Sequence, residues 1–271
     1  MNFHPSSHSL TSGSITGSML RFAFPLMLGN LLQQCYNIAD TLIVGRFLGA
    51  QALAAVGSAY TLMVFLTSIF IGLCMGGGAV VSLQFGGKNY AGIKQSLLTS
   101  LFLIGGITLL INILVILGIH PIIRLLQTPP ELEEVMYDYL IVIFLGLPGT
   151  FLYNYYAYLL RAVGNSVVPL LFLAVSVVLN IGLDPLLIFV FDMGVAVATV
   201  ASQYVAAIGL CFYTLHHFPF FRLQRSDLHY DRKSLREILS FSSLTCIQQS
   251  IMNLGILMVQ GLVNSFGTGV M

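Results

Sequence analysis

The sequence predicts an all-α polytopic membrane protein, in which a six-helix transmembrane bundle is followed by a seventh helix that begins a second repeat. Only 8% of the 271 residues are charged and 57% are hydrophobic, whereas a soluble domain carries roughly 25% charged residues because its surface must stay hydrated. Six apolar segments are long enough to cross a bilayer, which requires about 20 residues each. Polar residues of the first segment recur in a seventh, which indicates a repeated plan.

The composition disfavours several other classes. Eleven basic and ten acidic residues nearly cancel, so the charge pattern of a nucleic-acid-binding protein is missing. The four cysteines stand singly among apolar residues, and the six histidines form no HExxH-like pair, which disfavours disulfides and a zinc enzyme. The sequence contains no nucleophile–base pair of the kind that would indicate an intramembrane enzyme. We therefore expect neither catalysis nor a cofactor.

The chain divides into a polar N-terminus followed by six apolar spans. Residues 1–18 are polar and lack the pattern of a signal peptide, so the first apolar segment is expected to remain as a span. Residues 19–216 contain the six spans, which must be helices because backbone groups cannot stay unpaired in lipid. Their expected bounds are Leu20–Val44, Ala52–Leu83, Leu97–Ile119, Tyr139–Leu160, Val168–Phe191 and Gly194–Leu215. Four glycines of the second span indicate close helix contact or a flexible section, namely Gly72, Gly76, Gly77 and Gly78.

Two further segments complete the chain. Residues 217–236 hold five basic residues and two aspartates; we expect a cytoplasmic linker, with an interfacial segment as the alternative. Residues 237–271 are expected to form the first helix of an incomplete second lobe. Its Gln248, Gln249 and Asn253 repeat the Gln33, Gln34 and Asn37 of the first span, unless the match of short polar motifs is a coincidence. Transporters built from two repeats hold their sites near the repeat interface.

The basic residues predict an orientation. With the N-terminus in the cytoplasm, nine of the eleven basic residues fall on the cytoplasmic side, namely Arg21, Lys88, Lys94, Arg161, Arg222, Arg225, Arg232, Lys233 and Arg236. Only Arg46 and Arg124 fall outside, which agrees with the positive-inside rule. We therefore expect a multi-pass protein of the cell (inner) membrane with a cytoplasmic N-terminus.

Two carboxylates lie deep in predicted spans, Asp40 in the first and Asp184 in the fifth. An acidic residue in a membrane helix costs roughly 2.5–3.5 kcal/mol on insertion scales, so it usually faces a cavity or a partner and serves transport. Under the predicted orientation both lie in the external half of the membrane. The alternative is that each only caps a helix end near the interface.

Polar neighbours favour ion binding. Tyr36 precedes Asp40 by four residues and Asn180 precedes Asp184 by four, so each pair shares a helical face. Pro25 in the first span and Pro185 after the second carboxylate free backbone carbonyls nearby. Carboxylate, amide and carbonyl oxygens are hard ligands that suit a small cation, and a carboxylate can instead hold a proton. Thr199 and Ser202 of the sixth span and Tyr153 and Asn154 of the fourth add polar groups to the same interior.

Several segments together resemble the multidrug and toxic compound extrusion (MATE) family. They are Pro25-Leu26, Leu31–Gln34, Tyr36–Thr41, Val44–Gly49, Gln84–Lys88, Leu160–Ser166, Leu179–Pro185 and Ala198–Gln203. The resemblance covers nearly the whole chain, and the Arg-Ala-x-Gly-Asn and Leu-Asn-x-x-Leu-Asp-Pro blocks are its most specific parts. In one departure, the turn Met193–Thr199 is a few residues shorter than the family pattern, which would shift the sixth span.

The resemblance implies twelve helices in two lobes, of which this chain carries one six-helix lobe and the start of the second. It further implies sodium- or proton-driven antiport and multidrug efflux of small organic, often cationic, xenobiotics. The coupling-ion cluster would comprise Asp40, Asn180, Asp184 and Thr199, with Na⁺ held at the first three. Tyr36, Gln34, Asn154 and Pro25 would line the adjoining cavity.

Three functions are compatible with these features. The first is an antiporter lobe that works with a second lobe or as a homodimer in the lipid bilayer. The second is a truncated product that does not transport by itself. The third is a flippase for lipid-linked saccharides, which is disfavoured because such cargo carries phosphate and no basic residue lies deep in a predicted span.

Overall fold

The computed structural model describes residues 14–47, 49–126, 128, 130–191, 195–223 and 232–266; the side chains of Asp40 and of a few other helical residues lie outside this description. The long helices are α1 (Ile15–Phe47), α2 (Gly49–Gly86), α3 (Tyr90–Leu117), α5 (Glu133–Ala162), α6 (Val167–Phe191), α7 (Val195–His217) and α8 (Arg232–Ser265). The short elements are α4 (Ile119–Leu125) and 3-10 turns at Pro130–Leu132 and Pro219–Phe221. The seven long helices have the length and hydropathy of membrane spans, which confirms the predicted all-α polytopic fold.

Several helices extend beyond the expected spans because polar residues continue them past the apolar core. α3 begins at Tyr90, where the Asn89 side chain accepts a hydrogen bond from the Gly92 N–H at 3.0 Å and caps the helix. α8 begins at Arg232, so the last basic residues assigned to the 217–236 linker lie in its first turns. Residues 224–231 of that linker are outside the described part of the chain.

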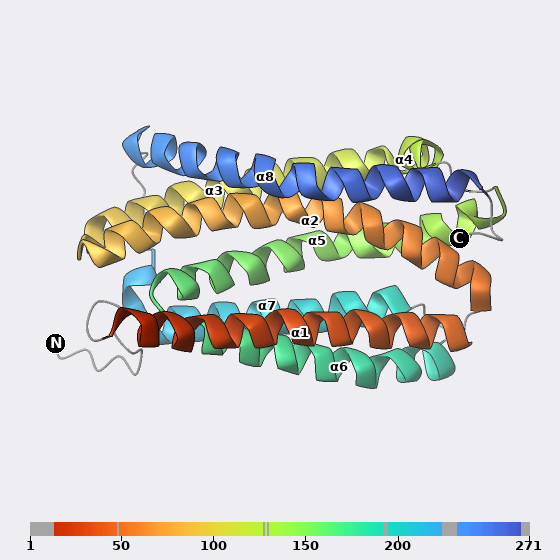
Figure 1. The fold of residues 1–271 in the computed structure, drawn as a ribbon, viewed down its shortest axis with the longest axis horizontal. Helices are drawn as coiled ribbons and strands as arrows, with labels where there is room; N and C mark the ends of the chain where they lie inside the picture. Colours follow the sequence, from red (N-terminus) through yellow and green to blue (C-terminus); the bar gives the residue numbers. More distant parts are fainter. Residues whose placement is uncertain are drawn as a thin grey trace.

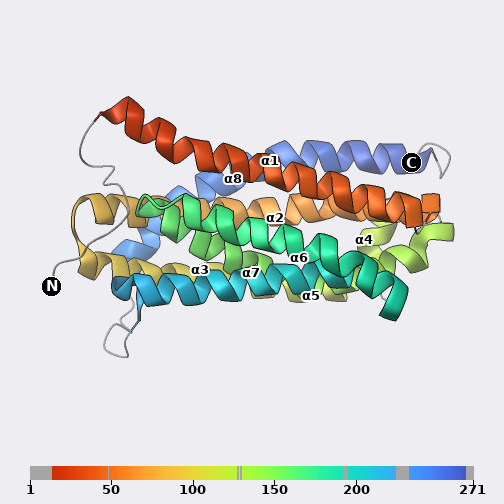
Figure 2. The same ribbon diagram turned by 90° about the horizontal axis from the view of Figure 1, so that it is seen from below.

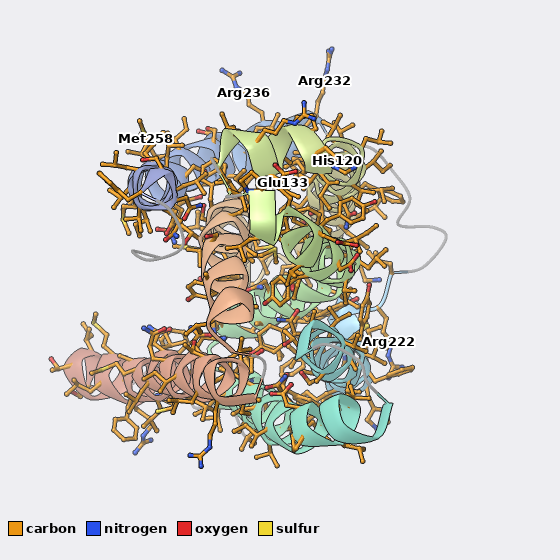
Figure 3. All side chains as sticks on the ribbon, turned by 90° about the vertical axis from the view of Figure 1, so that its right-hand side faces the viewer. His120, Glu133, Arg222, Arg232, Arg236 and Met258 are labelled. Atoms are coloured by element: carbon orange, nitrogen blue, oxygen red, sulfur yellow. The ribbon has the colours of Figure 1, made fainter. Side chains whose placement is uncertain are left out.

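The helices run roughly antiparallel along one long axis (Figures 1 and 2). α2 packs against α8 and α5. α5 also packs against α7, and both α7 and α1 contact α6. α1 and α8 therefore flank α2, which contacts both (Figure 3). The described basic residues gather mainly at one end of the bundle, which we call the basic end; the opposite end, where α5 begins with Glu133 and Glu134, is called the acidic end.

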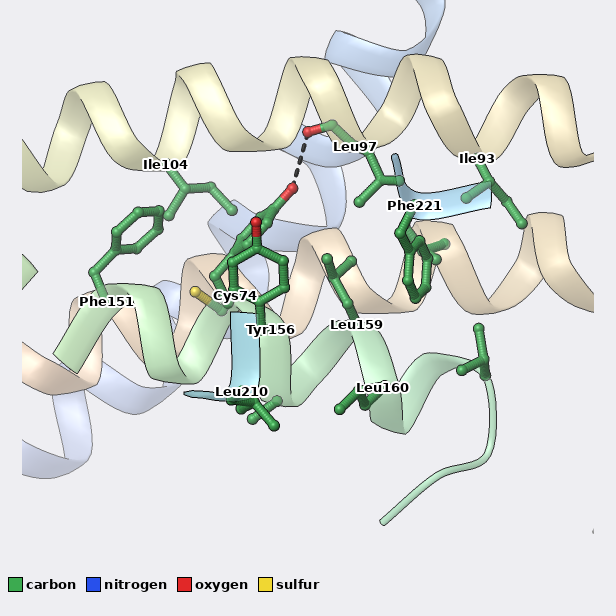
Figure 4. Packing of buried hydrophobic residues seen from close by; sticks show 14 of the residues in the cluster. Cys74, Ile93, Leu97, Ile104, Phe151, Tyr156, Leu159, Leu160, Leu210 and Phe221 are labelled. Atoms are coloured by element: carbon green, nitrogen blue, oxygen red, sulfur yellow. Dashed lines mark hydrogen bonds between the residues drawn. The ribbon is translucent and has the colours of Figure 1, made fainter. Parts of the chain in front are cut away.

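The buried core lies among α2, α3, α5 and α7 (Figure 4). Cys74, Ile104 and Leu160 are among its nearly inaccessible members. The Tyr155 hydroxyl in this core donates to the Leu97 carbonyl at 2.9 Å and lies 3.0 Å from the Ser100 hydroxyl. A buried phenol needs such a partner, since an unpaired polar group in an apolar interior is costly. The core therefore holds the helices that frame the site described below.

Small residues bring α2 and α8 into backbone contact. A Cβ added to Gly76 would lie 2.3 Å from the Ser242 Cα, and one added to Gly72 would lie 2.4 Å from the Cys246 Cα. The Thr245 hydroxyl donates to the Gly72 carbonyl at 2.6 Å across the same crossing. Such contact replaces the hydrophobic driving force that helices lack in lipid. The predicted close helix contact of Gly72 and Gly76 is thus confirmed.

Candidate functional site

A buried polar cluster joins α6 and α7 toward the acidic end. Asp184 is 0% exposed, Asn180 is 1% exposed and Thr199 is 8% exposed. Asn180 and Asp184 lie one turn apart on α6, as the sequence spacing predicts. Pro185 has no backbone N–H, so α6 lacks one helical hydrogen bond at this level.

The Asn180 amide bridges the two helices. In the orientation that satisfies both of its ends, Nδ2 donates to Asp184 Oδ2 at 3.2 Å and Oδ1 accepts from the Thr199 backbone N–H at 3.2 Å. In the opposite orientation, Nδ2 lies 3.5 Å from Asp184 Oδ1 and 3.4 Å from Thr199 Oγ1. Either orientation connects the carboxylate on α6 to Thr199 on α7.

Tyr36 extends the cluster to α1, because its hydroxyl donates to Thr199 Oγ1 at 3.2 Å. This bond places Thr199 in register with the cluster, although the short preceding turn had suggested a shift of the span. Asp40 follows Tyr36 by one turn of α1, but its side chain lies outside the described residues. The four residues predicted to hold the ion therefore comprise three that the structure brings together and one whose side chain is not described.

The described residues contain no group of three or more His, Cys, Asp or Glu side chains placed for a metal ion. A cation at the cluster would instead depend on mixed oxygen ligands, with one carboxylate from Asp184, the Asn180 amide and the Thr199 hydroxyl. Such ligands suit a hard cation rather than a transition metal.

A cavity of about 440 Å³ opens beside the cluster and is walled by α1, α2, α5, α6, α7 and α8. Tyrosines and amides provide most of its polar lining, namely Tyr36, Tyr60, Tyr139, Tyr153, Tyr158, Asn30, Gln33, Gln34, Asn37, Asn154, Gln203, Gln249 and Asn253. Binding sites for small molecules commonly have this size and this mixture of aromatic and polar groups.

The predicted cavity-lining residues Pro25, Gln34, Tyr36 and Asn154 all lie on this wall, together with Thr199. Asn154 donates to the Thr150 carbonyl of its own helix at 2.8 Å. The fully buried Asp184 is outside the set of lining residues. The cluster and the cavity are thus adjacent compartments that share the side chains of Tyr36 and Thr199.

Residues of both matching polar motifs line the same cavity. Gln34 and Asn37 from α1 and Gln249 and Asn253 from α8 all line it. The Asn37 amide donates to the Gln34 side chain at 3.2 Å and to the Tyr60 hydroxyl at 3.0 Å. The matching motifs therefore supply corresponding amides to one space, as expected for repeats that share a site.

Two features were missed by sequence reasoning. Arg161, which we expected at the cytoplasmic surface, also lines the cavity from the last turn of α5. A second buried polar cluster, here called the neutral cluster, joins α2 to α8 and consists of Ser58, Thr61, Gln260 and Asn264. Its hydroxyls and amides are too common in apolar helices to signal a cluster before their helices are paired.

Known proteins are similar over most of this chain. The MatE family profile matches residues 25–186. The probable multidrug resistance proteins YpnP and YoeA of Bacillus subtilis are 31% identical over 267 residues and 33% identical over 268 residues. These alignments cover 96% and 94% of this chain, but 59% of YpnP and 57% of YoeA.

The fold comparison agrees. A crystal structure of a MATE protein in complex with MaL6 has a TM-score of 0.86 at 24% identity, covering 98% of this chain and 60% of that chain. This chain therefore spans less than two thirds of the length of these relatives. It is a multi-pass membrane protein that belongs to the MATE family of transporters.

Proposed function

We propose that the chain is the ion-coupled part of a secondary active antiporter that exports small organic compounds in exchange for Na⁺ or H⁺. The observation that carries this proposal is the Tyr36–Thr199 hydrogen bond, which connects the cavity wall to the hydrogen-bonded Asp184 cluster. The names of YpnP and YoeA, both called probable multidrug resistance proteins, favour the same class of cargo.

In this proposal the bound cation and the Tyr36 hydroxyl compete for the Thr199 hydroxyl, and this competition couples the ion to the cavity. A cation or proton that reaches Asp184 changes the charge beside Asn180 and Thr199, and a cation also recruits the Thr199 oxygen as a ligand. Tyr36 then loses or reorients its bond, and the balance between two arrangements of α1 against α7 shifts. A bound ion moves this balance only as far as it binds one arrangement better than the other.

The basic end faces the cytoplasm in this proposal, because positively charged loops stay on the cytoplasmic side of the inner membrane. The cavity would be completed by a second lobe or a second copy of the chain, across the space between α1 and α8. Alternating access requires such an opposing wall. A chain without one would bind the ion and the cargo but would not move the cargo.

The test measures ion binding, which does not need a complete transporter. In nanodiscs, NaCl is titrated against a choline chloride blank, and proton release is followed with a pH-sensitive dye. The wild-type chain is expected to bind Na⁺ or to release a proton, whereas Asp184→Asn is expected to do neither. Asp138→Asn, an exposed change of the same chemistry in α5, is the matched control. Wild-type behaviour in Asp184→Asn would contradict the proposal.

Efflux is then measured with a fluorescent lipophilic cation in cells that express the chain, alone or with a complementary lobe. We expect ion-dependent efflux only when the opposing wall is present, and we expect Asp184→Asn to abolish it. Normal ion-dependent efflux by Asp184→Asn would overturn the assigned role of this carboxylate.

A further inference from the structure

The cavity wall carries one charged side chain among the described residues that line it, and that side chain is Arg161. It lies in the last turn of α5, at the basic end of the bundle. Its guanidinium carbon lies 5.0 Å from the centre of the Tyr158 ring, which also lines the cavity. A guanidinium stacked on an aromatic face keeps its N–H edge available for other partners.

The Arg161 Nε atom is buried and has no hydrogen-bond partner among the described residues. Buried donors without partners are uncommon in folded proteins, and each requires an explanation. A positive charge is favourable at a helix C-terminus, which explains the position of Arg161 but does not supply a partner for Nε. The ring of Tyr158 contacts one face of the guanidinium, and Nε still has no partner among the described residues.

The surroundings of Arg161 do not neutralise it. The described lining residues of the cavity include no aspartate or glutamate. The nearby Tyr153 hydroxyl donates to the Pro169 carbonyl at 2.9 Å and so has its own partner. The buried Ser166 also lines the cavity. A purely cationic compound therefore finds aromatic faces in this cavity but no described counter-charge, whereas an anionic group finds a guanidinium.

We propose that Arg161 is an anion-recognition point that binds a carboxylate or phosphate group of a compound whose aromatic body lies against the cavity tyrosines. The guanidinium fork can make two parallel hydrogen bonds to either group. This inference rests on the proposed function, because it names the class of cargo for the same cavity. It favours amphoteric or anionic aromatic compounds over simple cations. The anionic group can come from a soluble compound or from a lipid headgroup.

The experiment compares two dyes that differ in one charge. Rhodamine B carries a free carboxylate, and its methyl ester does not. Fluorescence polarisation gives the dissociation constant of each dye for the full chain in phosphatidylcholine nanodiscs. We expect the wild-type chain to bind the acid about tenfold more tightly than the ester, as one additional charge-assisted hydrogen-bonded pair allows.

Three variants sharpen the result. Arg161→Gln is expected to abolish the preference for the acid, while the cationic ester binds at least as tightly as to the wild type because only a like charge is removed; retained ester binding shows that the cavity is intact. Arg161→Lys keeps the charge without the planar fork and is expected to retain a smaller preference. Arg236→Gln removes an exposed basic side chain of α8 that points away from the bundle (Figure 3), and it is expected to behave as wild type.

Equal affinity for the two dyes in both the wild type and Arg161→Gln would overturn this inference and leave the proposed function standing. Binding of neither dye would overturn this inference, whereas the proposed function is overturned separately, by wild-type ion binding in Asp184→Asn. A second arm adds phosphatidylglycerol to the nanodiscs and counts retained lipids by native mass spectrometry. Loss of the acid preference, with a retained lipid that Arg161→Gln does not hold, would identify the anionic headgroup of phosphatidylglycerol as the ligand.

Discussion

We compare two buried polar clusters among the described residues of this bundle. One contains a carboxylate and is the proposed ion site, and the other contains no ionisable group and holds two helices together. The neutral cluster joins α2 to α8 near the acidic end and contains hydroxyls and amides alone. The Asp184 cluster joins α6, α7 and, through Tyr36, α1. Ser58, Asn264, Asn180 and Asp184 are all at most 1% exposed, so burial does not distinguish the two clusters.

The neutral cluster closes on itself. The Asn264 amide donates to the Leu126 carbonyl at 2.9 Å, and its oxygen accepts from the Ser58 hydroxyl at 3.1 Å and from the Gln260 amide at 2.9 Å. None of these side chains carries a charge. Their hydrogen bonds connect α2 to α8, so the cluster stabilises the packing of these two helices. The Asp184 cluster contains a carboxylic acid and borders the cavity, and we propose that it exchanges a proton or a cation. The presence of a carboxylic acid, rather than burial or polarity, therefore distinguishes the proposed ion site from the neutral cluster.

The largest expected effect follows from removing that charge. Asp184→Asn should eliminate cation binding and proton release while changing the free energy of unfolding by about 1 kcal/mol or less, because an amide oxygen can still accept from Asn180. Ion titration and unfolding in mixed detergent micelles measure the two quantities. Strong destabilisation by Asp184→Asn would mean that this cluster also stabilises the helix packing. The two clusters would then not differ in this role.

The reverse change places a charge in the neutral cluster. Asn264→Asp removes the donor to the Leu126 carbonyl and buries a carboxylate, which should destabilise the chain by about 3–5 kcal/mol, as for other uncompensated buried charges. Unfolding in mixed micelles measures the loss. Asn253→Asp on the same helix is the control, since Asn253 lines the cavity and should tolerate the charge with a much smaller loss. Equal losses of unfolding free energy in the two variants would show that the neutral cluster tolerates a charge as well as the cavity wall does.

A smaller effect is expected from the shared hydroxyl. Thr199→Val keeps the shape and removes Oγ1, which should weaken cation binding about tenfold, the value of one ligand or hydrogen bond to a charged group. Thr199→Ser, which keeps the hydroxyl, should bind as the wild type does. Unchanged binding in Thr199→Val would exclude this hydroxyl from the ion site.

The smallest effect concerns the link to α1. Tyr36→Phe removes the bond to Thr199 and should change the unfolding free energy by about 0.5–1.5 kcal/mol. If the two side chains act through this bond, their effects on cation affinity should not add in the double variant with Thr199→Val. Additive effects would show that Tyr36 contributes to the cavity alone and does not couple it to the ion cluster.

Periodic and composition-based features of the sequence predicted much of the fold. The spans were predicted because lipid requires long apolar helices. Gly72, Gly76, Gly77 and Gly78 predicted either close helix contact or a flexible section in α2, and Gly72 and Gly76 make backbone contact with α8. The pairing of Asn180 with Asp184 was predicted from their spacing of four residues within one helix. Such contacts need only local geometry, so sequence spacing is sufficient for them.

Contacts between helices required the structure. Sequence spacing does not relate Tyr36 to Thr199, which are 163 residues apart and meet because α1 and α7 both pack on α6. Ser58 and Asn264, separated by 206 residues, meet because backbone contact at two glycines sets α8 against α2.

Apolar length and composition predicted that this protein spans a membrane, where its long helices lie and that two of them carry an intramembrane acid. The tertiary structure alone decided that Asp184 lies behind the cavity wall, that Arg161 lies on it and that the neutral cluster is closed. The physical reason is that hydrophobic length and helical periodicity act within one segment, whereas a buried hydrogen bond depends on the mutual rotation and depth of two packed helices.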